Sequence, residues 1–303
     1  MEQVRSVAKP SVTVVTVVKN AATTIADCVE SVLGQNCPVE YIVVDGGSTD
    51  GTIDIVNQYS SQISTIVSEP DKSIYDGMNK GVALATGSVL GMLNADDVYA
   101  HENVIAHVAE AFEDPAVESC YGDLIYVDPD NCSRITRYWK SGPYDRKLFY
   151  NGWMPPHPTF FARRSVYEKY GSFNVGLGTS ADYELMLRFL LKHGISSVHI
   201  PDLMVIMRGG GVSNISVRNR WRANRADMKA WKVNGLAPKP WTILAKPLSK
   251  LLQYVFKNSR DLSWLALDWP RRKTKERTSC IGRSDCEASK FPERDQRAAT
   301  SAL

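Results

Sequence analysis

The chain has 303 residues, of which 44% are hydrophobic and 23% charged, and its formal net charge is +3 at pH 7. These values are typical of a soluble globular protein and exclude disordered, collagenous and membrane-embedded chains. The six cysteines form no C-x-x-C pair and have no histidine at zinc-finger spacing, so we expect neither a metal cluster nor a disulfide framework. This pattern predicts a protein of a reducing compartment. No stretch has the length of a membrane span, and Val12–Val18 is too short for the core of a signal peptide.

The first part of the sequence alternates β-branched runs with amphipathic segments. Ser11–Val18 predicts a strand, and a helix capped by Thr23 or Thr24 follows it. Tyr41–Val44 predicts a second strand, before a helix that carries residues 53–59. This order of strand, helix, strand and helix is typical of a parallel sheet, in which ligands bind beyond the carboxyl ends of the strands.

The loop after the second predicted strand combines an acid with several glycines. Asp45 ends the strand, where its carboxylate could accept hydrogen bonds from a base or a ribose, while the glycines let the backbone approach a ligand. The loop does not match the G-x-G-x-x-G fingerprint of dinucleotide sites. The alternative is a glycine-rich turn in which Ser48 or Asp50 caps the next helix.

A later apolar run, Val89–Leu93, ends abruptly in the sequence NADD at residues 94–97. Two adjacent carboxylates at the end of a buried strand need compensation by a cation or by hydrogen-bond donors. Mg²⁺ or Mn²⁺ suits them, because these ions bind one or two carboxylates together with water and phosphate. The alternative is that Asp97 caps a helix over Ala100–Phe112 while Asp96 faces solvent.

The second half of the sequence offers a histidine among prolines. Tyr121–Val127 predicts a strand that turns and returns along Arg134–Trp139. Met154–Phe161 then predicts an extended run that carries His157. A lone histidine is more often a structural hydrogen-bond partner than a catalytic group, so both roles stay open for His157.

A helix is predicted over Ala181–Leu191, with Asp182 in its first turn. The helix dipole favours a carboxylate there. The alternatives are that Asp182 only caps the helix, or that Glu184, on another face, is the functional acid. The expected buried stripe consists of Leu185, Met186, Phe189 and Leu190.

After a last predicted strand at Ser197–Ile200, the chain becomes basic. A helical pattern that begins at Trp241 is apolar on one side and cationic on the other, and a basic run follows at residues 271–277. Such a segment can lie on an anionic membrane surface, or it can pack on the preceding domain and leave the basic run as a solvated tail. Residues 279–303 are polar and predict disorder. No aromatic platform accompanies the cations, so we expect no nucleic-acid partner. The two sides of the helical pattern are Leu244, Leu248, Leu251, Leu252 and Val255, and Lys246, Lys250 and Lys257.

Five motifs resemble, in order, those of the family 2 glycosyltransferases with the GT-A fold: VTVVKNAATTI, VVDGGSTDGT, SEPDKSIYDGMNKG, ATGSVLGMLNADD and SADYELMLR. The resemblance covers residues 11–213 and is greatest to bacterial enzymes that build colanic-acid and O-antigen type polysaccharides. It implies an α/β fold of the GT-A (Rossmann-like) type, with a mixed, mainly parallel sheet flanked by helices and, here, a helical C-terminal extension.

The resemblance also implies the reaction. We expect an inverting transfer of one sugar from a nucleotide-diphosphate sugar, with a UDP-sugar favoured, to a saccharide or lipid-linked saccharide acceptor in cell-surface polysaccharide biosynthesis. The Q-x-x-R-W motif of processive synthases is absent, so transfer of a single sugar is expected. The alternatives are a non-catalytic nucleotide-sugar-binding or scaffold protein of the same fold, and a nucleotidyltransferase. The latter would carry a glycine-rich basic loop directly after the first strand, which residues 19–22 do not resemble.

Carried over residue by residue, the resemblance assigns roles. Asp182 would be the catalytic base, and His157 and Arg208 would contact the acceptor or a phosphate. Asp97, together with Asp96, would hold Mg²⁺ or Mn²⁺. For Asp76 and Lys80 the alternative is an i,i+4 ion pair on a helix. The expected nucleotide-binding residues are Thr16, Val17, Val18, Asp45, Asp71, Asp76, Lys80, Asn94 and Asp96.

These assignments predict three regions. Residues 1–213 would form the glycosyltransferase domain, residues 214–270 a basic and amphipathic helical extension that can attach to a membrane surface, and residues 271–303 a basic, disordered tail. We expect a cytoplasmic enzyme held peripherally on the inner face of the plasma membrane.

Overall fold

The computed structural model of the protein describes residues 10–209 and 217–242. All of these described residues belong to one compact unit. The predicted amphipathic helix beyond Trp241, the basic run at residues 271–277 and the predicted disordered tail lie outside the described residues, so the three-region division stays a prediction.

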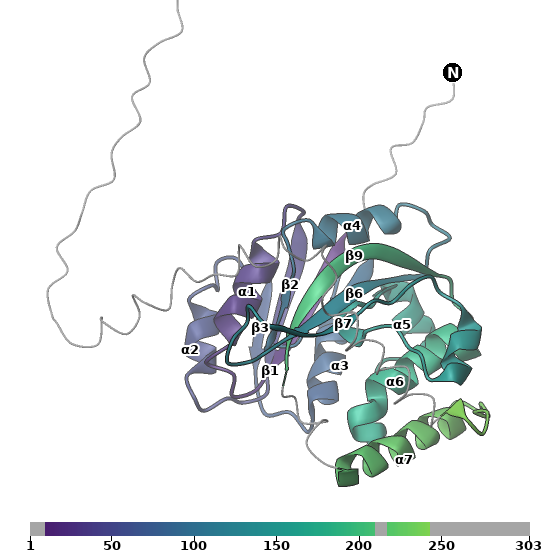
Figure 1. Cartoon of the computed structure of the whole chain (residues 1–303). Helices are drawn as coiled ribbons and strands as arrows, with labels where there is room; N and C mark the ends of the chain where they lie inside the picture. Colours follow the sequence, from purple (N-terminus) through teal and green to yellow (C-terminus); the bar gives the residue numbers. More distant parts are fainter. Residues whose placement is uncertain (1–9, 210–216, 243–303) are drawn as a thin grey trace, which may run out of the picture. The chain divides into compact units, whose positions relative to one another are not determined.

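The described strands form one mixed nine-stranded sheet (Figure 1). Its order is β3-β2-β1-β4-β8-β6-β9-β5, and β7 pairs with β6. The first four strands pair in parallel, whereas β8 joins β4 in the antiparallel direction. The bounds are β1 (Val12–Val18), β2 (Val39–Asp45), β3 (Thr65–Ser68), β4 (Val89–Met92), β5 (Asp97–Tyr99), β6 (Ser119–Val127), β7 (Ile135–Trp139), β8 (Phe161–Arg163) and β9 (Ser197–Arg208).

Helices cover both faces of this sheet, so the central parallel strands are buried on both sides and read as continuous apolar runs. In β1, Val14 packs in the core beneath α1 and α4, while Val15 packs in the core beneath α3, α5 and α6. Figure 1 shows α7 alongside α6. The bounds are α1 (Ile25–Leu33), α2 (Thr52–Asn57), α3 (Ile74–Leu84), α4 (Val104–Ala111), α5 (Arg164–Tyr170), α6 (Ala181–Met186) and α7 (Val217–Val233).

The predicted fold class is confirmed, and most differences in detail concern helix ends. The helix α2 ends at Asn57 and leaves Tyr59 outside it. Thr24 precedes α1, but its hydroxyl donates to the Ala21 carbonyl instead of capping the helix.

The segment after the sequence NADD at residues 94–97, which we call the acidic motif, differs from its prediction. The helix expected over Ala100–Phe112 begins only at Val104, because residues 97–99 form the strand β5. β5 pairs with β9, which was expected to stop at Ile200 but continues to Arg208. Asp97 therefore does not cap a helix, and that alternative was wrong.

His157 also lies in a different conformation from the one predicted. Residues His157–Thr159 form a 3-10 turn rather than an extended run, and only Phe161–Arg163 is a strand. The Thr159 hydroxyl stabilises the turn by its contact with the Pro156 carbonyl at 2.9 Å.

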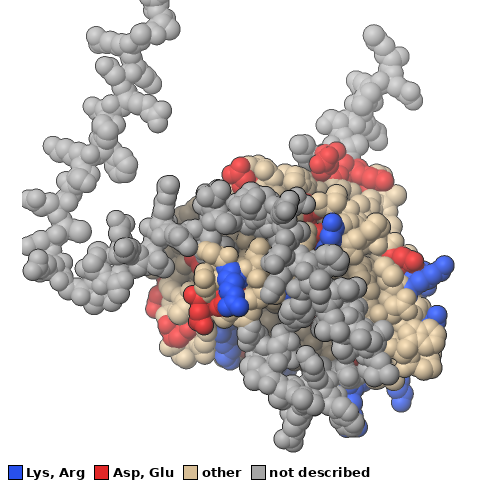
Figure 2. Space-filling model, in the orientation of Figure 1, with Lys and Arg blue, Asp and Glu red and all other residues tan. Residues whose placement is uncertain are grey.

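Among the described residues, none of the helices combines the length and the apolar character needed to cross a membrane. On the face drawn in Figure 2, the described basic side chains are interspersed with the described acidic ones.

Candidate active site

Asp182 and His157, two of the residues singled out in the sequence, lie together in the structure. His157 Nδ1 is 3.3 Å from one carboxylate oxygen of Asp182. The Tyr75 hydroxyl, from α3, donates to the other oxygen at 3.4 Å. Tyr75 lies between the predicted nucleotide-binding residues Asp71 and Asp76 but was not recognised as a site residue, because only the fold brings its hydroxyl to Asp182 in α6. We call Tyr75, His157 and Asp182 the carboxylate cluster.

The carboxylate cluster is partly open to solvent. The Asp182 side chain is 18% exposed and the His157 side chain 32%. Burial, together with the neighbouring Asp182 carboxylate, raises the pKa of Tyr75 far above its usual value, so this phenol stays a neutral hydrogen-bond donor. The arrangement holds an accessible carboxylate between two polar side chains.

Asp182 does not act as the N-cap of α6, since its carboxylate accepts a hydrogen bond from the adjacent Tyr183 N–H at 2.8 Å and it lies within the first turn. The reserve candidate Glu184 is buried and paired with Arg188 at 3.0 Å. Asn234 also donates to the Glu184 carboxylate, at 3.2 Å. Glu184 therefore stabilises the helix, and Asp182 is the accessible acid of this turn.

Two side chains of α7 bind residues in and just before the first turn of α6. Trp231 is buried and donates its indole N–H to the Tyr183 hydroxyl at 2.9 Å. The Ser180 hydroxyl, just before α6, donates to the Asp227 carboxylate at 3.0 Å. The first turn of α6 is thereby held from both ends, which limits the movement of Asp182.

The segment before α3 contains a second group of charged residues. Ser73 caps α3 by accepting from the Asp76 N–H at 3.2 Å, and the Asp76 carboxylate accepts from the Lys72 N–H at 3.1 Å. The i,i+4 pair expected between Asp76 and Lys80 is absent from this described helix, and that alternative was wrong. Lys80 instead pairs with Asp71 and, at 2.7 Å, with Glu69.

Hydrogen bonds from Lys80 to Asp71 and Glu69 raise the pKa of Lys80, so it stays cationic. The Asp71 carboxylate is almost completely buried, and its Oδ2 has no hydrogen-bond partner among the described residues. This oxygen lies so close to Gly77 that an added Cβ there would come within 2.6 Å of it. Asp71 therefore retains an acceptor oxygen in a tightly packed place.

The ends of β1 and β2 lie side by side, with Val18 in register with Asp45. Asp45 is buried and already accepts hydrogen bonds from Ser48 and, at 2.6 Å, from Ser68. The Asp50 carboxylate accepts from the N–H of Thr52, the first residue of α2. The loop thus has contacts of the kind expected for a glycine-rich turn before a helix, which was the alternative to a ligand site. These contacts lie next to the strand end where a ligand was expected.

The other strand residues expected at the nucleotide are buried. The Thr16 hydroxyl accepts from the Tyr41 hydroxyl at 3.1 Å in the core beneath α1. Val17 and Val18 are also buried. Because these side chains are buried, a nucleotide could contact this part of β1 only through its backbone or through the slightly exposed edge of the Val17 side chain, which lies against Gly77.

The acidic motif places its two carboxylates in contrasting environments. Asp96 is partly exposed, whereas Asp97 has 0% exposure. Asn94 donates to Asp97 Oδ2 at 2.9 Å, but Asp97 Oδ1 has no hydrogen-bond partner among the described residues. Burial raises the pKa of Asp97 well above its usual value, and the Asp96 charge adds to this, while the Asn94 hydrogen bond and the Arg208 charge oppose it.

Arg208 lies beside the acidic motif. Its guanidinium donates to the Asp96 carbonyl at 3.0 Å and to the Asp27 carboxylate at 2.5 Å. This position follows from the pairing of β5 with β9, in which Asp97 is in register with Met207. Arg208 was expected in a glycine-rich loop, but it ends the strand β9.

A divalent cation fits the residues of this motif. Ionisation of the buried Asp97 carboxylate, whose Oδ1 has no hydrogen-bond partner among the described residues, has a cost that a nearby cation would remove. Asp96 adds a second carboxylate that solvent can reach. Carboxylate oxygens are the ligands that Mg²⁺ and Mn²⁺ prefer.

Comparison with known proteins decides the family. Residues 13–171 match the family model described as "Glycosyl transferase family 2". The chain belongs to this family. It is therefore a glycosyltransferase, and the non-catalytic alternative is left without support. A relative from Mycobacterium bovis (strain BCG / Pasteur 1173P2), named "PGL/p-HBAD biosynthesis glycosyltransferase", is 32% identical over 218 residues, which are 69% of this chain and 82% of the relative.

Solved structures support the GT-A fold. The crystal structure of S. aureus TarS superposes with a TM-score of 0.59 at 17% identity, covering 83% of this chain and 44% of TarS, so the chain spans less than half of that protein. Its fragment 1-349 in complex with UDP gives a TM-score of 0.58 at 16% identity and 84% and 75% coverage. The mannosyltransferase PcManGT from Pyrobaculum calidifontis, in complex with GDP-Man and Mn2+, gives 0.57 at 19% identity and 85% and 72% coverage.

Proposed function

We propose that this glycosyltransferase moves one sugar, with inversion, from a nucleotide-diphosphate sugar to a saccharide or lipid-linked saccharide in cell-surface polysaccharide biosynthesis. The observation that carries the proposal is the accessible Asp182 carboxylate between Tyr75 and His157. The UDP complex of the fold relative TarS supports a UDP-sugar as donor, although the GDP-Man complex of PcManGT shows that the fold accepts another base.

Asp182 acts in this proposal as the general base. A single displacement needs a group that takes the proton from the acceptor hydroxyl as that oxygen attacks the anomeric carbon. The Tyr75 hydroxyl and the His157 ring hold the carboxylate by its two oxygens, and neither partner removes it from solvent. Tyr75 and His157 are thus positioning residues, and His157 is also close enough to the base to contact the acceptor.

Asp96 and Asp97 would hold Mg²⁺ or Mn²⁺. When bound, such an ion supplies Lewis-acid stabilisation of the diphosphate that leaves the sugar. The partly exposed Asp96 is the carboxylate that solvent and donor can reach, and Asp97 offers a buried oxygen that has no partner among the described residues. Arg208, which binds the Asp96 carbonyl, is our candidate for a contact with the donor phosphates.

For the remaining residues expected at the nucleotide, the contacts in the structure support the proposed role to different degrees. Asp71 offers a buried acceptor oxygen that has no partner among residues 10–209 and 217–242, and Lys80 pairs with the same carboxylate. Asp45, Asp76 and Asn94 already bind neighbouring residues, so each would contact a nucleotide in addition to a structural role. Of this group, Asp71→Asn is the substitution that should weaken nucleotide binding most.

The donor class can be tested directly. The full chain would be titrated by calorimetry with UDP-, GDP- and dTDP-linked sugars, with and without Mn²⁺, and sugar transfer to saccharide acceptors would be followed by mass spectrometry. We expect metal-dependent binding of one nucleotide class and a product of inverted anomeric configuration. A product with retained configuration, or no binding of any nucleotide sugar to the folded protein, would contradict the proposal.

We also propose that the basic run at residues 271–277 helps to hold the enzyme at an anionic membrane surface. Each cation near such a surface contributes about 1 kcal/mol. Changing all five cations of the run to Gln should therefore reduce sedimentation with phosphatidylserine vesicles at least tenfold, and leave transfer to a water-soluble acceptor unchanged. Equal sedimentation of both proteins would refute this attachment. The five cations are Arg271, Arg272, Lys273, Lys275 and Arg277.

A further inference from the structure

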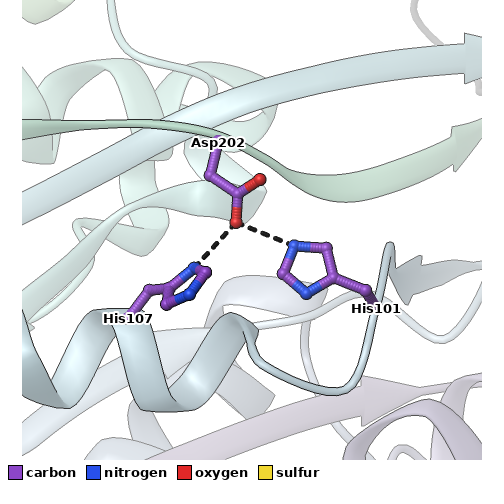
Figure 3. Close-up of side chains that lie close together, drawn as sticks. All are labelled: His101, His107 and Asp202. Carbon is purple, nitrogen blue, oxygen red and sulfur yellow. Dashed lines mark hydrogen bonds and ion pairs between the residues drawn. The ribbon is translucent and has the colours of Figure 1, made fainter.

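Two histidines and an aspartate meet at one place on β9 (Figure 3). His101 lies between β5 and α4, His107 lies on α4, and Asp202 lies in β9. His101 Nε2 is 2.7 Å and His107 Nδ1 is 2.8 Å from the same oxygen, Oδ2 of Asp202. We call these three residues the His-His-Asp cluster. None of the family motifs includes them, and no role in sugar transfer requires them.

The His-His-Asp cluster is separate from the acidic motif. Asp97 pairs with Met207 on β9, and Tyr99 pairs with Val205. Asp202 precedes both partners on the strand, and at about 3.3 Å per residue it lies on the order of 15 Å along β9 from the position of Met207. A ligand at Asp202 would therefore not share coordination with Asp96 or Asp97.

The donor atoms of the cluster suit a borderline transition metal. The two imidazole nitrogens and the carboxylate oxygen all lie within 4.8 Å of one another. Two histidines and one carboxylate are a ligand set of Zn²⁺ and of related ions such as Co²⁺ and Ni²⁺, whereas Mg²⁺ prefers oxygen ligands. The side chains of His101, His107 and Asp202 are 21%, 41% and 27% exposed, so an ion and its remaining water ligands could reach them from solvent.

The protonation of the cluster determines what an ion must displace. The Asn103 N–H donates to His101 Nδ1 at 3.2 Å, which places the proton of the neutral His101 ring on Nε2, facing Asp202. Burial raises the pKa of Asp202, but the hydrogen bonds from His101 and His107 outweigh this and hold the pKa below its usual value, so Asp202 is ionised. An ion must replace the two protons that the rings present to Asp202, and His101 must then give up the Asn103 contact.

We propose that His101, His107 and Asp202 bind a borderline divalent cation, with Zn²⁺ as the representative ion. The ion would link α4, the segment before it and β9, and would stabilise the catalytic domain without taking part in sugar transfer. The competing account is a hydrogen-bonded contact that binds no metal.

The test is Zn²⁺ binding to the full chain without a polyhistidine tag. Competition with a chromophoric chelator would be measured in excess Mg²⁺, which occupies oxygen-rich sites. We expect the wild type and the control variant to bind one equivalent of Zn²⁺ more than His107→Gln and Asp202→Asn, and Zn²⁺ to raise the melting temperature of the wild type and the control but not of these two variants. His193→Gln is the matched control, because His193 is exposed and lies outside the cluster, on the ring of Tyr170.

A second readout follows the proton on His101. Nitrogen-15 NMR of the histidine rings should show the His101 proton move from Nε2 to Nδ1 when Zn²⁺ is added, with a shift of the Asn103 amide signal. His107→Gln preserves the hydrogen-bonding capacity of a partly exposed position, so it should remain folded even if Asp202→Asn does not. Equal Zn²⁺ stoichiometry in the wild type, His107→Gln and His193→Gln, or an unchanged His101 tautomer, would overturn the proposal.

Discussion

Asp182 and Asp97 are chemically identical side chains in opposite environments. Asp182 is partly exposed and its two oxygens contact Tyr75 and His157, whereas Asp97 is completely buried and one of its oxygens has no partner within the part of the chain that the structure describes. An accessible carboxylate held by two polar groups can receive a proton from an acceptor. An enclosed carboxylate with an unused lone pair and a raised pKa suits a cation instead. Environment, not residue type, therefore separates the proposed base from the proposed metal ligand.

The largest expected effect is that of Asp182→Asn. General-base catalysis contributes about 10²–10⁴-fold, so the turnover of sugar transfer should fall by roughly this factor while the protein stays folded. Steady-state kinetics with a saturating donor would measure the loss. Asp54→Asn, an exposed acid on α2, is the control and should retain full turnover. Retention of near wild-type turnover by Asp182→Asn would remove Asp182 from the mechanism.

The next effect concerns the metal. Asp97→Asn keeps the size of the side chain but removes its charge. The apparent affinity for the activating Mn²⁺ should therefore fall by at least about tenfold, which corresponds to about 1.4 kcal/mol. Mn²⁺ titration of transfer activity would show this as a rise in the concentration of half-maximal activation. Asp96→Asn should act in the same direction. If both variants were activated by Mn²⁺ like the wild type, the motif would not hold the ion.

Tyr75→Phe should have a smaller effect on the same base. The substitution removes one hydrogen bond to Asp182 and keeps the ring that packs on Phe173 at a centroid distance of 5.7 Å. A hydrogen bond to a charged group contributes about 1.5–3 kcal/mol, and partial compensation by solvent leads us to expect a roughly tenfold loss of turnover. The KM for the donor should not change. His157→Asn should behave similarly, and a changed donor KM without a change in turnover would mean that these residues bind donor instead.

The smallest effect is a pH dependence of stability. Because Asp97 has a raised pKa in the folded state, the metal-free folded protein binds more protons than the unfolded chain above the ordinary Asp pKa of 3.8, and its stability falls as the pH rises through this window. Asp97→Asn removes that loss. Near pH 7 the metal-free variant should melt about 2–4 °C higher than the wild type, if the effect is about 1 kcal/mol. Calorimetry at pH 5 and pH 8 would test this, and a lower melting temperature of the variant at pH 8 would contradict it.

Local patterns were sufficient to predict much of this fold. The β-branched runs predicted β1 and β2, the alternation of strands and helices predicted the parallel half of the sheet, and the apolar stripe predicted the helix that carries Asp182. Each depends on periodicity within one short segment. The confirmed family resemblance rests on motifs of the same local kind.

Contacts between distant segments could not be predicted. The pairing of β5 with β9 depends on a partner about a hundred positions away, and without it Asp97 was taken as a helix cap or a strand end. Lys80 pairs with Asp71 and not with Asp76, which is one helical turn away. The Tyr75 hydroxyl on α3 donates to Asp182 on α6, although 107 positions separate the two residues in the sequence. The His-His-Asp cluster likewise joins three segments whose spacing matches no motif.

The most direct test of the contrast between the two carboxylates measures binding and chemistry in the same two variants. For Asp182→Asn and Asp97→Asn, UDP binding with Mn²⁺ would be measured by calorimetry and sugar transfer by single-turnover quench. If the titration with UDP-, GDP- and dTDP-linked sugars shows binding of another nucleotide, that nucleotide replaces UDP. We predict that Asp182→Asn binds nucleotide and Mn²⁺ like the wild type but transfers the sugar at least about a hundredfold more slowly, whereas Asp97→Asn loses the Mn²⁺-dependent part of binding. Transfer by Asp182→Asn at the wild-type rate, together with unchanged Mn²⁺-dependent binding by Asp97→Asn, would contradict the account.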